Sequence, residues 1–362
     1  MSLASALEQT VRRHGNRPAI IDSERNFTWF EFGDRVARAA AVLSGFGLRA
    51  GDRFGILAQN SFRQAELFYA GYWMGVVPVP VNTRLASPEI RRIFDDAICK
   101  MVVVDETFAS KLDDEELALW RERSFSIERD YESMLNAATP LARHDSGEAD
   151  DAILLYTSGT TGRSKGVRLT HGNLLAHGKQ FAAAMDARSD DVYLHVAPMF
   201  HSADVLGTAY TLLGAAHSYV PRFSPNLVLQ AVEECAVTAI VLTPTMVIMT
   251  LQDGDLAAHD LSSLRQLTYG GAPLAVKWIE RAAKSFSSAA IRQGYGLTET
   301  SCVLATLGKE EHAHAMADGD NALLHSVGRP LDEVSIRILD GGGREMKAGE
   351  AGEIVLRGPN VS

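Results

Sequence analysis

The sequence predicts an α/β protein with two βα-layered subdomains, mainly parallel sheets, and the start of a small β subdomain at its C-terminal end. Three observations favour this class. Short apolar runs alternate with segments of helical periodicity between residues 28 and 104. The same alternation resumes between residues 170 and 286, and from about residue 327 strand patterns with Gly-rich turns replace it. Parallel strands need helical crossovers, so this alternation indicates parallel sheets.

The first subdomain is predicted to span residues 1–170. Thr28 and Glu31 have the spacing of a capping box, so a helix should begin there and end near Gly45. Ser87 and Pro88 predict another helix start, with serine as the cap and proline in the first turn. The polar, acidic stretch 107–149 lacks clear periodicity and is expected to be a peripheral excursion. The other predicted elements are helices at 61–74 and 87–97 and strands at 54–58, 77–81, 101–104 and 153–155.

The second subdomain is predicted to span residues 171–326, and the small β subdomain residues 327–362. Thr170 is a candidate cap for a helix that ends near Met185. His312 and His314 lie in a stretch, 308–325, that is expected to be a mobile surface loop, because an H-x-H pattern alone is weak support for a metal site. The other predictions are helices at 202–213, 225–235 and 273–286, strands at 192–196, 238–242, 264–269, 334–339 and 352–356, and a hairpin turn at 340–343.

Residues 156–167 have the composition of a phosphate-binding loop. After the apolar run 153–155 they contain three glycines, five Ser/Thr hydroxyls and one lysine, Lys165. Glycine lets backbone N–H groups converge on an anion, hydroxyls add donors, and lysine adds a positive charge. The Walker pattern does not fit, because Ser164 and Val167 stand where its second glycine would be. A P-loop kinase or GTPase is therefore disfavoured, and a flexible Gly/Ser linker is the alternative.

Five sequence blocks, in order, resemble the adenylate-forming superfamily, which includes acyl- and aryl-CoA synthetases, peptide-synthetase adenylation domains and firefly luciferase. The first is the loop just described, and the resemblance covers essentially the whole chain. The later blocks are Pro198-Met199-Phe200-His201, Gly270-Gly271-Ala272-Pro273, Gln293-Gly294-Tyr295-Gly296-Leu297-Thr298-Glu299-Thr300, and the pair Val327-Gly328-Arg329-Pro330 and Gly352-Glu353-Ile354-Val355-Leu356-Arg357-Gly358-Pro359.

The resemblance implies roles for individual residues in binding ATP. Thr298 would hydrogen-bond the α-phosphate and Glu299 would ligate Mg²⁺, while Tyr295 would stack on adenine. The glycines at 294 and 296 would allow the nucleotide a close approach. The β- and γ-phosphates would be held by the loop residues Thr157, Ser158, Gly159, Thr160, Thr161, Gly162 and Lys165, and adenine would be flanked by Gly271, Ala272 and Pro273. Lys165, Thr298 and Glu299 would then be the catalytic residues.

The resemblance also implies where the carboxylic acid binds. His201, Gly270 and Gly296 would contact the acid, with His201 as a wall or gate of its tunnel that moves no proton. From the residues alone, His201 beside an apolar segment would be a core histidine, and the stretch 294–300 would be a strand running into a capped helix. Four apolar residues favour an uncharged acyl tail over malonate, namely Ala203, Val205, Met246 and Val303.

Composition limits the partners. The net charge is −10, from 35 basic and 45 acidic residues, without a basic run, which argues against nucleic acid. Three cysteines, too few and too far apart for a disulfide frame, indicate a reducing compartment. No secretory signal is apparent, and the longest apolar stretch, 69–81, is too short to span a membrane. A cytoplasmic enzyme that acts on a small carboxylic acid, ATP and coenzyme A is expected.

The sequence departs from the family after Ser362. Family members continue with a Thr-Gly-Asp motif and a mobile C-terminal domain of roughly 100 residues that carries a catalytic lysine. We therefore expect this chain to be a large N-terminal domain that binds ATP weakly and makes little acyl-CoA.

Four functions remain open from the sequence. The leading one is an acyl-CoA synthetase of the fatty-acid type, which forms acyl-AMP and pyrophosphate and then acyl-CoA. The second is an aryl-acid (coumarate-type) CoA ligase. The third is a stand-alone adenylation module that feeds a carrier protein. The fourth is a non-catalytic nucleotide-binding protein, which the retention of Lys165, Thr298 and Glu299 disfavours.

Overall fold

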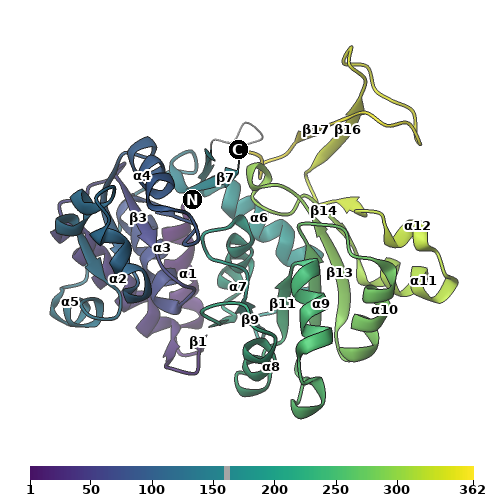
Figure 1. Ribbon diagram of the computed structural model, residues 1–362, viewed down its shortest axis with the longest axis horizontal. Coiled ribbons are helices and arrows are strands. Elements are labelled where there is room, and N and C mark those ends of the chain that lie inside the picture. Colours follow the sequence, from purple (N-terminus) through teal and green to yellow (C-terminus); the bar gives the residue numbers. More distant parts are fainter. Residues whose placement is uncertain (159–163) are drawn as a thin grey trace.

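A computed structural model describes residues 1–158 and 164–362, and its two main sheets are mostly parallel, as predicted (Figure 1). The smaller sheet has the strand order β4-β3-β5-β6 and all its pairs are parallel. Its strands are β3 (Arg53–Leu57), β4 (Val77–Pro80), β5 (Cys99–Val104) and β6 (Ser124–Ser126). Beside it lie the helices α2 (Trp29–Gly45), α3 (Phe62–Met74), α4 (Ser87–Asp96) and α5 (Tyr131–Ala137) and the 3₁₀ helices η1 (Glu106–Asp113) and η2 (Ala118–Arg123).

The larger sheet has nine strands in the order β15-β14-β13-β12-β11-β9-β10-β1-β2. The pairs from β1 to β13 are parallel, and those at both edges are antiparallel. Its strands are β1 (Pro18–Ile21), β2 (Asn26–Thr28), β9 (Val192–His195), β10 (Ala216–Tyr219), β11 (Ala239–Leu242), β12 (Gln266–Gly270), β13 (Ala290–Tyr295), β14 (Ala305–Leu307) and β15 (Arg329–Pro330). Because β1 and β2 belong to it, the large sheet crosses the predicted boundary at residue 170.

Helices follow most strands of the large sheet, and two hairpins complete the fold. The helices are α1 (Leu3–His14), α6 (His171–Ala184), α7 (Gly207–Leu213), α8 (Pro225–Glu234), α9 (Pro244–Asp253), α10 (Val276–Ser285), α11 (Lys309–Asp318) and α12 (Asn321–Leu324). Short 3₁₀ turns are η3 (Ser202–Leu206), η4 (Leu256–Ala258) and η5 (Thr298–Thr300). The hairpins are β7 (Asp151–Ser158) with β8 (Ser164–Thr170), and β16 (Ser335–Leu339) with β17 (Glu353–Arg357). The second hairpin projects from the rest of the chain (Figure 1).

Most predicted helix starts are confirmed to within one residue, with three exceptions. The helix predicted at 273–286 begins at Val276, and the helix predicted at 202–213 begins as the 3₁₀ turn η3. The third exception is the cap of α4. Glu31 Oε2 accepts from the Thr28 backbone N–H at 2.7 Å, which completes the capping box of α2. The cap of α4 was predicted to be Ser87, but it is Ala86. The carboxylate of Glu89 accepts from the Ala86 N–H at 3.0 Å, which is one half of a capping box, while alanine offers no side-chain acceptor to the first-turn N–H groups.

Two predictions of irregular structure were wrong. The stretch 107–149 was expected to be peripheral, yet it adds the edge strand β6 and buries Trp120 and Tyr131. Its buried apolar residues are divided among two 3₁₀ helices, a three-residue strand and the short helix α5, so no single period runs through the stretch. The stretch 308–325 was expected to be a loop, but it forms α11 and α12. There the buried His312 shares a 3.0 Å hydrogen bond with the Tyr269 hydroxyl, which a mobile surface histidine could not do.

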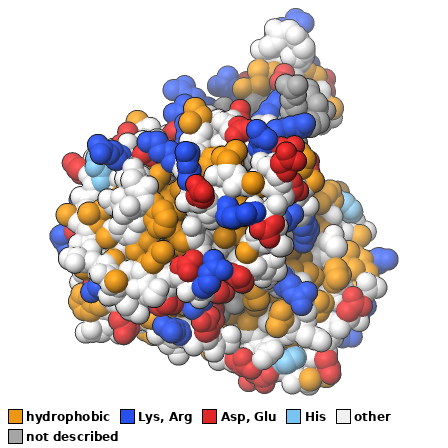
Figure 2. Space-filling model, turned by 60° about the vertical axis from the view of Figure 1, so that its left-hand side comes forward, with side chains coloured by type: hydrophobic (Ala, Val, Ile, Leu, Met, Phe, Trp, Pro, Cys, Tyr) orange, Lys and Arg blue, Asp and Glu red, His pale blue; other side chains and the backbone are white. Residues whose placement is uncertain are grey.

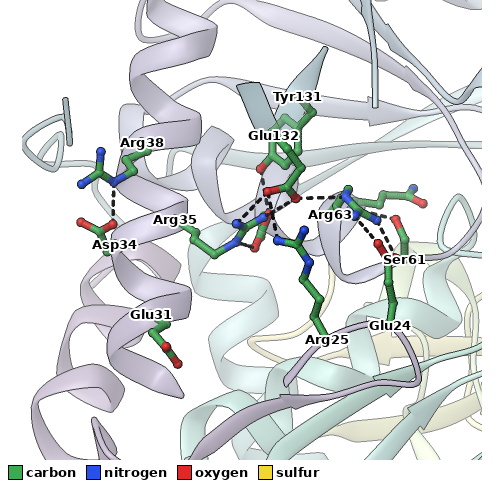
Figure 3. Close-up of polar contacts among 12 residues, drawn as sticks. Glu24, Arg25, Glu31, Asp34, Arg35, Arg38, Ser61, Arg63, Tyr131 and Glu132 are labelled. Atoms are coloured by element: carbon green, nitrogen blue, oxygen red, sulfur yellow. Dashed lines mark hydrogen bonds and ion pairs between the residues drawn. The ribbon is translucent and has the colours of Figure 1, made fainter. Parts of the chain in front are cut away.

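A buried ion-pair network joins α2, α3 and α5 (Figure 3). The Arg35 guanidinium donates to Glu66 Oε2 at 3.1 Å and to Glu132 Oε1 at 2.8 Å. Tyr131 donates to the same Glu66 oxygen at 2.9 Å, and Glu66 is fully buried. Arg63 donates to Glu132 at 3.2 Å and also pairs with Glu24, near the start of β2. The network therefore fixes α5 and the N-terminal strands against α2 and α3.

The surface agrees with the mixed charge of the sequence. On the face shown in Figure 2, acidic and basic side chains are interspersed over the N-terminal half of the chain. Cys99, Cys235 and Cys302 are free thiols. Among the described residues, no helix has the length and apolar character needed to cross a membrane.

Candidate functional site

Residues 156–158 of the predicted phosphate loop lie in β7 and residues 164–167 lie in β8, the two strands of one hairpin. The strand expected at 153–155 is confirmed as part of β7, while β8 was not predicted. Thr157 pairs with Lys165 and Ser158 with Ser164 across the hairpin, so the lysine lies opposite the first hydroxyl residue of the loop. The predicted residues Gly159, Thr160, Thr161 and Gly162 lie outside the described part of the chain.

Tyr156 anchors the base of this hairpin. Its hydroxyl donates to the Asp96 carboxylate at the end of α4. Its ring lies over the cross-strand partner Gly166, where an added Cβ would be 3.2 Å from the ring. The aromatic residue that precedes the loop therefore ties the hairpin to the smaller sheet and its helices.

Six of the predicted nucleotide-binding residues line one cavity of about 290 Å³. They form or follow the carboxyl ends of β12 and β13, which meet at one edge of the sheet because the two strands are parallel neighbours. The six are Gly271, Ala272, Pro273, Gly294, Tyr295 and Gly296. The remaining lining residues include Leu324, His325 and Val327, which sequence reasoning missed because it assigned most of that stretch to a loop. In open α/β sheets, ligands bind at this edge.

Three glycines at the carboxyl ends of β12 and β13 are required by the protein's own packing. A Cβ at Gly296 would lie 1.7 Å from the backbone oxygen of Cys302, a contact that no side chain can make. A Cβ at Gly294 would lie 3.1 Å from Val303, and one at Gly270 would lie 2.6 Å from the Gly294 oxygen. Gly294 and Gly296 were predicted to allow a close approach by the nucleotide, and Gly270 was predicted to contact the acid. The structure adds a second reason, the tight turn between β13 and β14.

Thr298 and Glu299 lie in this turn, in η5. Thr298 is buried, and its hydroxyl donates to Ser202 Oγ at 3.3 Å, whereas Glu299 is exposed. The turn leaves η5 through Ser301 and Cys302, at φ 55° and 90°. Such angles are uncommon for residues with a side chain, so the surrounding contacts must hold this backbone in place.

The hairpin and the Thr298–Glu299 turn lie together. β8, which carries Lys165, is in contact with η5. The Ser202 contact with Thr298 also brings the block that ends in His201 to the same place. Three blocks that are far apart in the sequence therefore meet at the carboxyl edge of the large sheet.

His201 itself is exposed and does not line the 290 Å³ cavity. It caps η3, and its Nδ1 accepts from the Ala203 N–H at 3.4 Å. Gly270 also lies outside the cavity lining. Of the three predicted acid-contacting residues, Gly296 lines the nucleotide cavity, and His201 and Gly270 do not.

A buried polar network behind η3 was missed. Asp204 Oδ1 lies 2.6 Å from His195 Nδ1, and His195 Nε2 lies 3.0 Å from His217 Nδ1. His217 Nε2 lies 3.1 Å from the hydroxyl of Thr211 in α7. Histidines on the adjacent strands β9 and β10 were the only signal in the sequence. The network fixes η3, and thus Ser202, to the sheet.

Acidification is expected to destabilise this region through His177. Its Nε2 accepts from the Val303 N–H at 3.2 Å, and burial lowers its pKa from 6.5 to about 3. The neutral ring contributes fully to the free energy of unfolding above pH 6.5. This contribution is lost as the pH falls toward 3, because the unfolded chain binds the proton at a higher pH than the folded chain. At about pH 5 this histidine alone should lower the free energy of unfolding by about 2 kcal/mol.

The measurement is urea unfolding at about pH 7.5 and 5. His177→Gln should reduce the pH-dependent loss, while His314→Gln, at an exposed position of α11, should leave it unchanged. Equal losses in wild type and His177→Gln would contradict the assignment.

Comparisons with known proteins identify the family of the chain. The AMP-binding enzyme model matches residues 7–362. The chain belongs to the AMP-binding enzyme family. This AMP-binding enzyme is 34% identical to the feruloyl-CoA synthase of an Amycolatopsis species, over 97% of the chain and 67% of that relative. It is 28% identical to 4-coumarate–CoA ligase-like 8 of Arabidopsis thaliana, over 91% of the chain and 61% of the relative. The enzyme thus spans about two thirds of these relatives.

Solved structures of the family have the same fold. The N-terminal domain of FACL13 from Mycobacterium tuberculosis superposes with a TM-score of 0.90 at 25% identity and covers 100% of this chain and 90% of that one. The o-succinylbenzoate CoA synthetase of Bacillus subtilis, in complex with its acyl-adenylate intermediate, gives 0.85 at 26% identity, over 98% of this chain and 69% of that one. The predicted resemblance and fold class are therefore confirmed.

Proposed function

We propose that this enzyme activates a carboxylic acid with ATP, forming acyl-AMP and pyrophosphate, and then transfers the acyl group to coenzyme A. The observation that carries the proposal is the single 290 Å³ cavity lined by six of the residues expected to hold the nucleotide. The contact of β8 with η5 supports it, because it brings a lysine-bearing strand to the turn that holds Thr298 and Glu299.

In this proposal a carboxylate oxygen attacks the α-phosphorus, and the bond from that phosphorus to pyrophosphate breaks. Charge then accumulates on phosphate oxygens, which fixed donors and cations stabilise. Tyr295 and the backbone beside Ala272 hold adenine, and Thr298 donates to the α-phosphate. The departing pyrophosphate is held by residues of the predicted phosphate loop, namely Thr157, Ser158, Gly159, Thr160, Thr161, Gly162 and Lys165.

Glu299 fits a role as the protein ligand of Mg²⁺. Its carboxylate is exposed beside the buried Thr298, and Mg²⁺ usually takes one or two carboxylates together with phosphate oxygens and water. Among the described residues no group of three potential ligands gathers into an all-protein metal site, which agrees with a metal brought by the nucleotide. When bound, Mg²⁺ neutralises charge on the phosphates.

We propose a fatty acid as the acyl substrate. Val205 and Val303, expected to border the acid site, are buried apolar residues, and Ala203 and Met246 are half-buried. An aromatic acid is the second candidate, favoured by the 34% identity to the feruloyl-CoA synthase.

Binding of acyl-adenylate mimics tests the proposal without requiring turnover. The chain would be titrated with dodecanoyl and feruloyl sulfamoyl adenosine and with AMP. We expect an acyl mimic to bind at least about 100-fold more tightly than AMP, since intermediate mimics engage both sites. Thr298→Val should weaken the mimic about tenfold, because a hydrogen bond to a charged group is lost. Thr139→Val, at an exposed position, is the matched control.

Two results would change the proposal. Tighter binding of the feruloyl mimic would assign an aromatic acid. If neither mimic binds better than AMP, adenylation is refuted for this site.

A further inference from the structure

Residues 359–362 cross from the start of α6 to the Thr298–Glu299 turn. They lie beside the start of α6, and the C-terminal end is marked in Figure 1. On one side, Asn173 Nδ2 donates to the backbone oxygens of Pro359 and Val361, each at 2.9 Å. On the other side, the Ser362 N–H donates to the backbone oxygen of Glu299 at 2.9 Å. We call residues 359–362 the strap.

Asn360 is the centre of the strap and is fully buried. Its Nδ2 donates to the backbone oxygen of Thr300 at 2.9 Å. Its own backbone oxygen accepts from the Ser301 hydroxyl at 2.9 Å. Ser301 begins the left-handed stretch of the turn. Asn360 thus holds the backbone at the point where the turn adopts its unfavourable angles.

The strap also reaches the phosphate hairpin through Asn173. Asn173 Oδ1 accepts from the N–H and the hydroxyl of Thr170, the last residue of β8, at 3.0 and 2.8 Å. One amide side chain therefore caps α6 with its oxygen and holds the strap with its nitrogen. This continuous set of hydrogen bonds connects β8 to η5.

We propose that the strap positions Thr298 and Glu299 relative to the phosphate hairpin, with Asn360 and Asn173 as positioning residues for the nucleotide. The identity of the ligand, a nucleotide, rests on the proposed function. The restraint of the Thr298–Glu299 turn by the strap does not depend on that proposal. Without the strap the turn would relax from its left-handed backbone, and the Thr298 hydroxyl and Glu299 carboxylate would lose their fixed places.

Two substitutions separate the strap from ordinary packing. Asn360→Ala removes the donor to Thr300. Asn173→Asp keeps the oxygen that caps α6 and replaces the nitrogen that holds Pro359 and Val361 by an acceptor oxygen, which repels their backbone oxygens. Asn136→Ala, at an exposed position of α5, is the matched control.

Cys302 provides a local readout that is independent of activity. It follows Ser301, its side chain packs against the core, and burial raises its thiol pKa to about 12. Cys99 in β5 is buried in the smaller sheet, and burial also raises its thiol pKa to about 12. A released turn should expose the thiol of Cys302 and leave that of Cys99 protected.

The experiment measures maleimide labelling of each cysteine by peptide mass spectrometry and Mg·ATP affinity by calorimetry. In Asn360→Ala and Asn173→Asp we expect Cys302 to label at least about tenfold faster and Mg·ATP to bind about tenfold more weakly, the effect of one or two lost buried hydrogen bonds. Cys99 labelling and Asn136→Ala should match wild type.

Each other outcome has a definite meaning. If the labelling of Cys302 and the Mg·ATP affinity are both unchanged, the proposed positioning role of the strap is overturned. Equal acceleration at Cys99 and Cys302 also overturns it, because the whole fold is then destabilised. If wild type fails to bind Mg·ATP while Cys302 responds as expected, the strap's hold on the turn stands and the proposed function fails.

Discussion

Replacing Glu66 by alanine is expected to lower the free energy of unfolding by about 3–5 kcal/mol. Glu66 is fully buried and accepts hydrogen bonds from Arg35 and Tyr131 (Figure 3). Its removal leaves the nearly buried guanidinium of Arg35 with Glu132 as its remaining partner and the Tyr131 hydroxyl without an acceptor. The loss would be measured by urea denaturation, followed by circular dichroism.

Two further variants test this explanation. Asp34→Ala breaks the exposed Arg38–Asp34 pair on α2 and should cost less than about 1 kcal/mol. The double replacement of Arg35 and Glu66 by methionine should recover much of the loss, because no buried charge is then left behind. An equal effect of Glu66→Ala and Asp34→Ala would contradict the importance of burial.

Gly296→Ala is expected to reduce the affinity for an acyl-adenylate mimic by about 100-fold, the scale of effect that a 1 Å displacement has at a reacting centre. The new methyl group would overlap the Cys302 backbone oxygen at 1.7 Å, so the turn that carries Thr298 must move. Gly45→Ala is the control, since a Cβ there meets no atom within 4 Å.

Gly294→Ala should have a smaller effect than Gly296→Ala. Its Cβ would meet the Val303 side chain at 3.1 Å, and a side chain can rotate where a backbone oxygen cannot. The comparison uses titration calorimetry on all three variants. Equal affinities for Gly296→Ala and wild type would show that the clash relaxes without moving the site.

The sequence was most informative where local chemistry repeats a known pattern. The capping box at Thr28, the apolar strand 153–155 and the ordered glycine and hydroxyl blocks were recognisable because each depends on neighbouring residues. β8 was missed because its alternation of exposed and buried residues, around Val167 and Leu169, is hidden within a Gly- and Ser-rich run.

Contacts between distant residues could not be predicted. Thr298 donates to Ser202, which is 96 residues away, and Asn173 reaches Val361 over 188 residues. No local pattern marks such pairs. The roles assigned to Lys165 and His201 stay predictions, although the strand of the first and the η3 turn capped by the second both adjoin the Thr298 turn.

The place of β1 has a consequence for synthesis on the ribosome. Ile20 pairs in parallel with His217, so an early strand must wait until most of the nascent chain has emerged. Such distant pairing slows folding and leaves strand edges exposed to other chains. We expect the N-terminal residues to need protection by chaperones during translation, and a fragment that stops before β10 to aggregate.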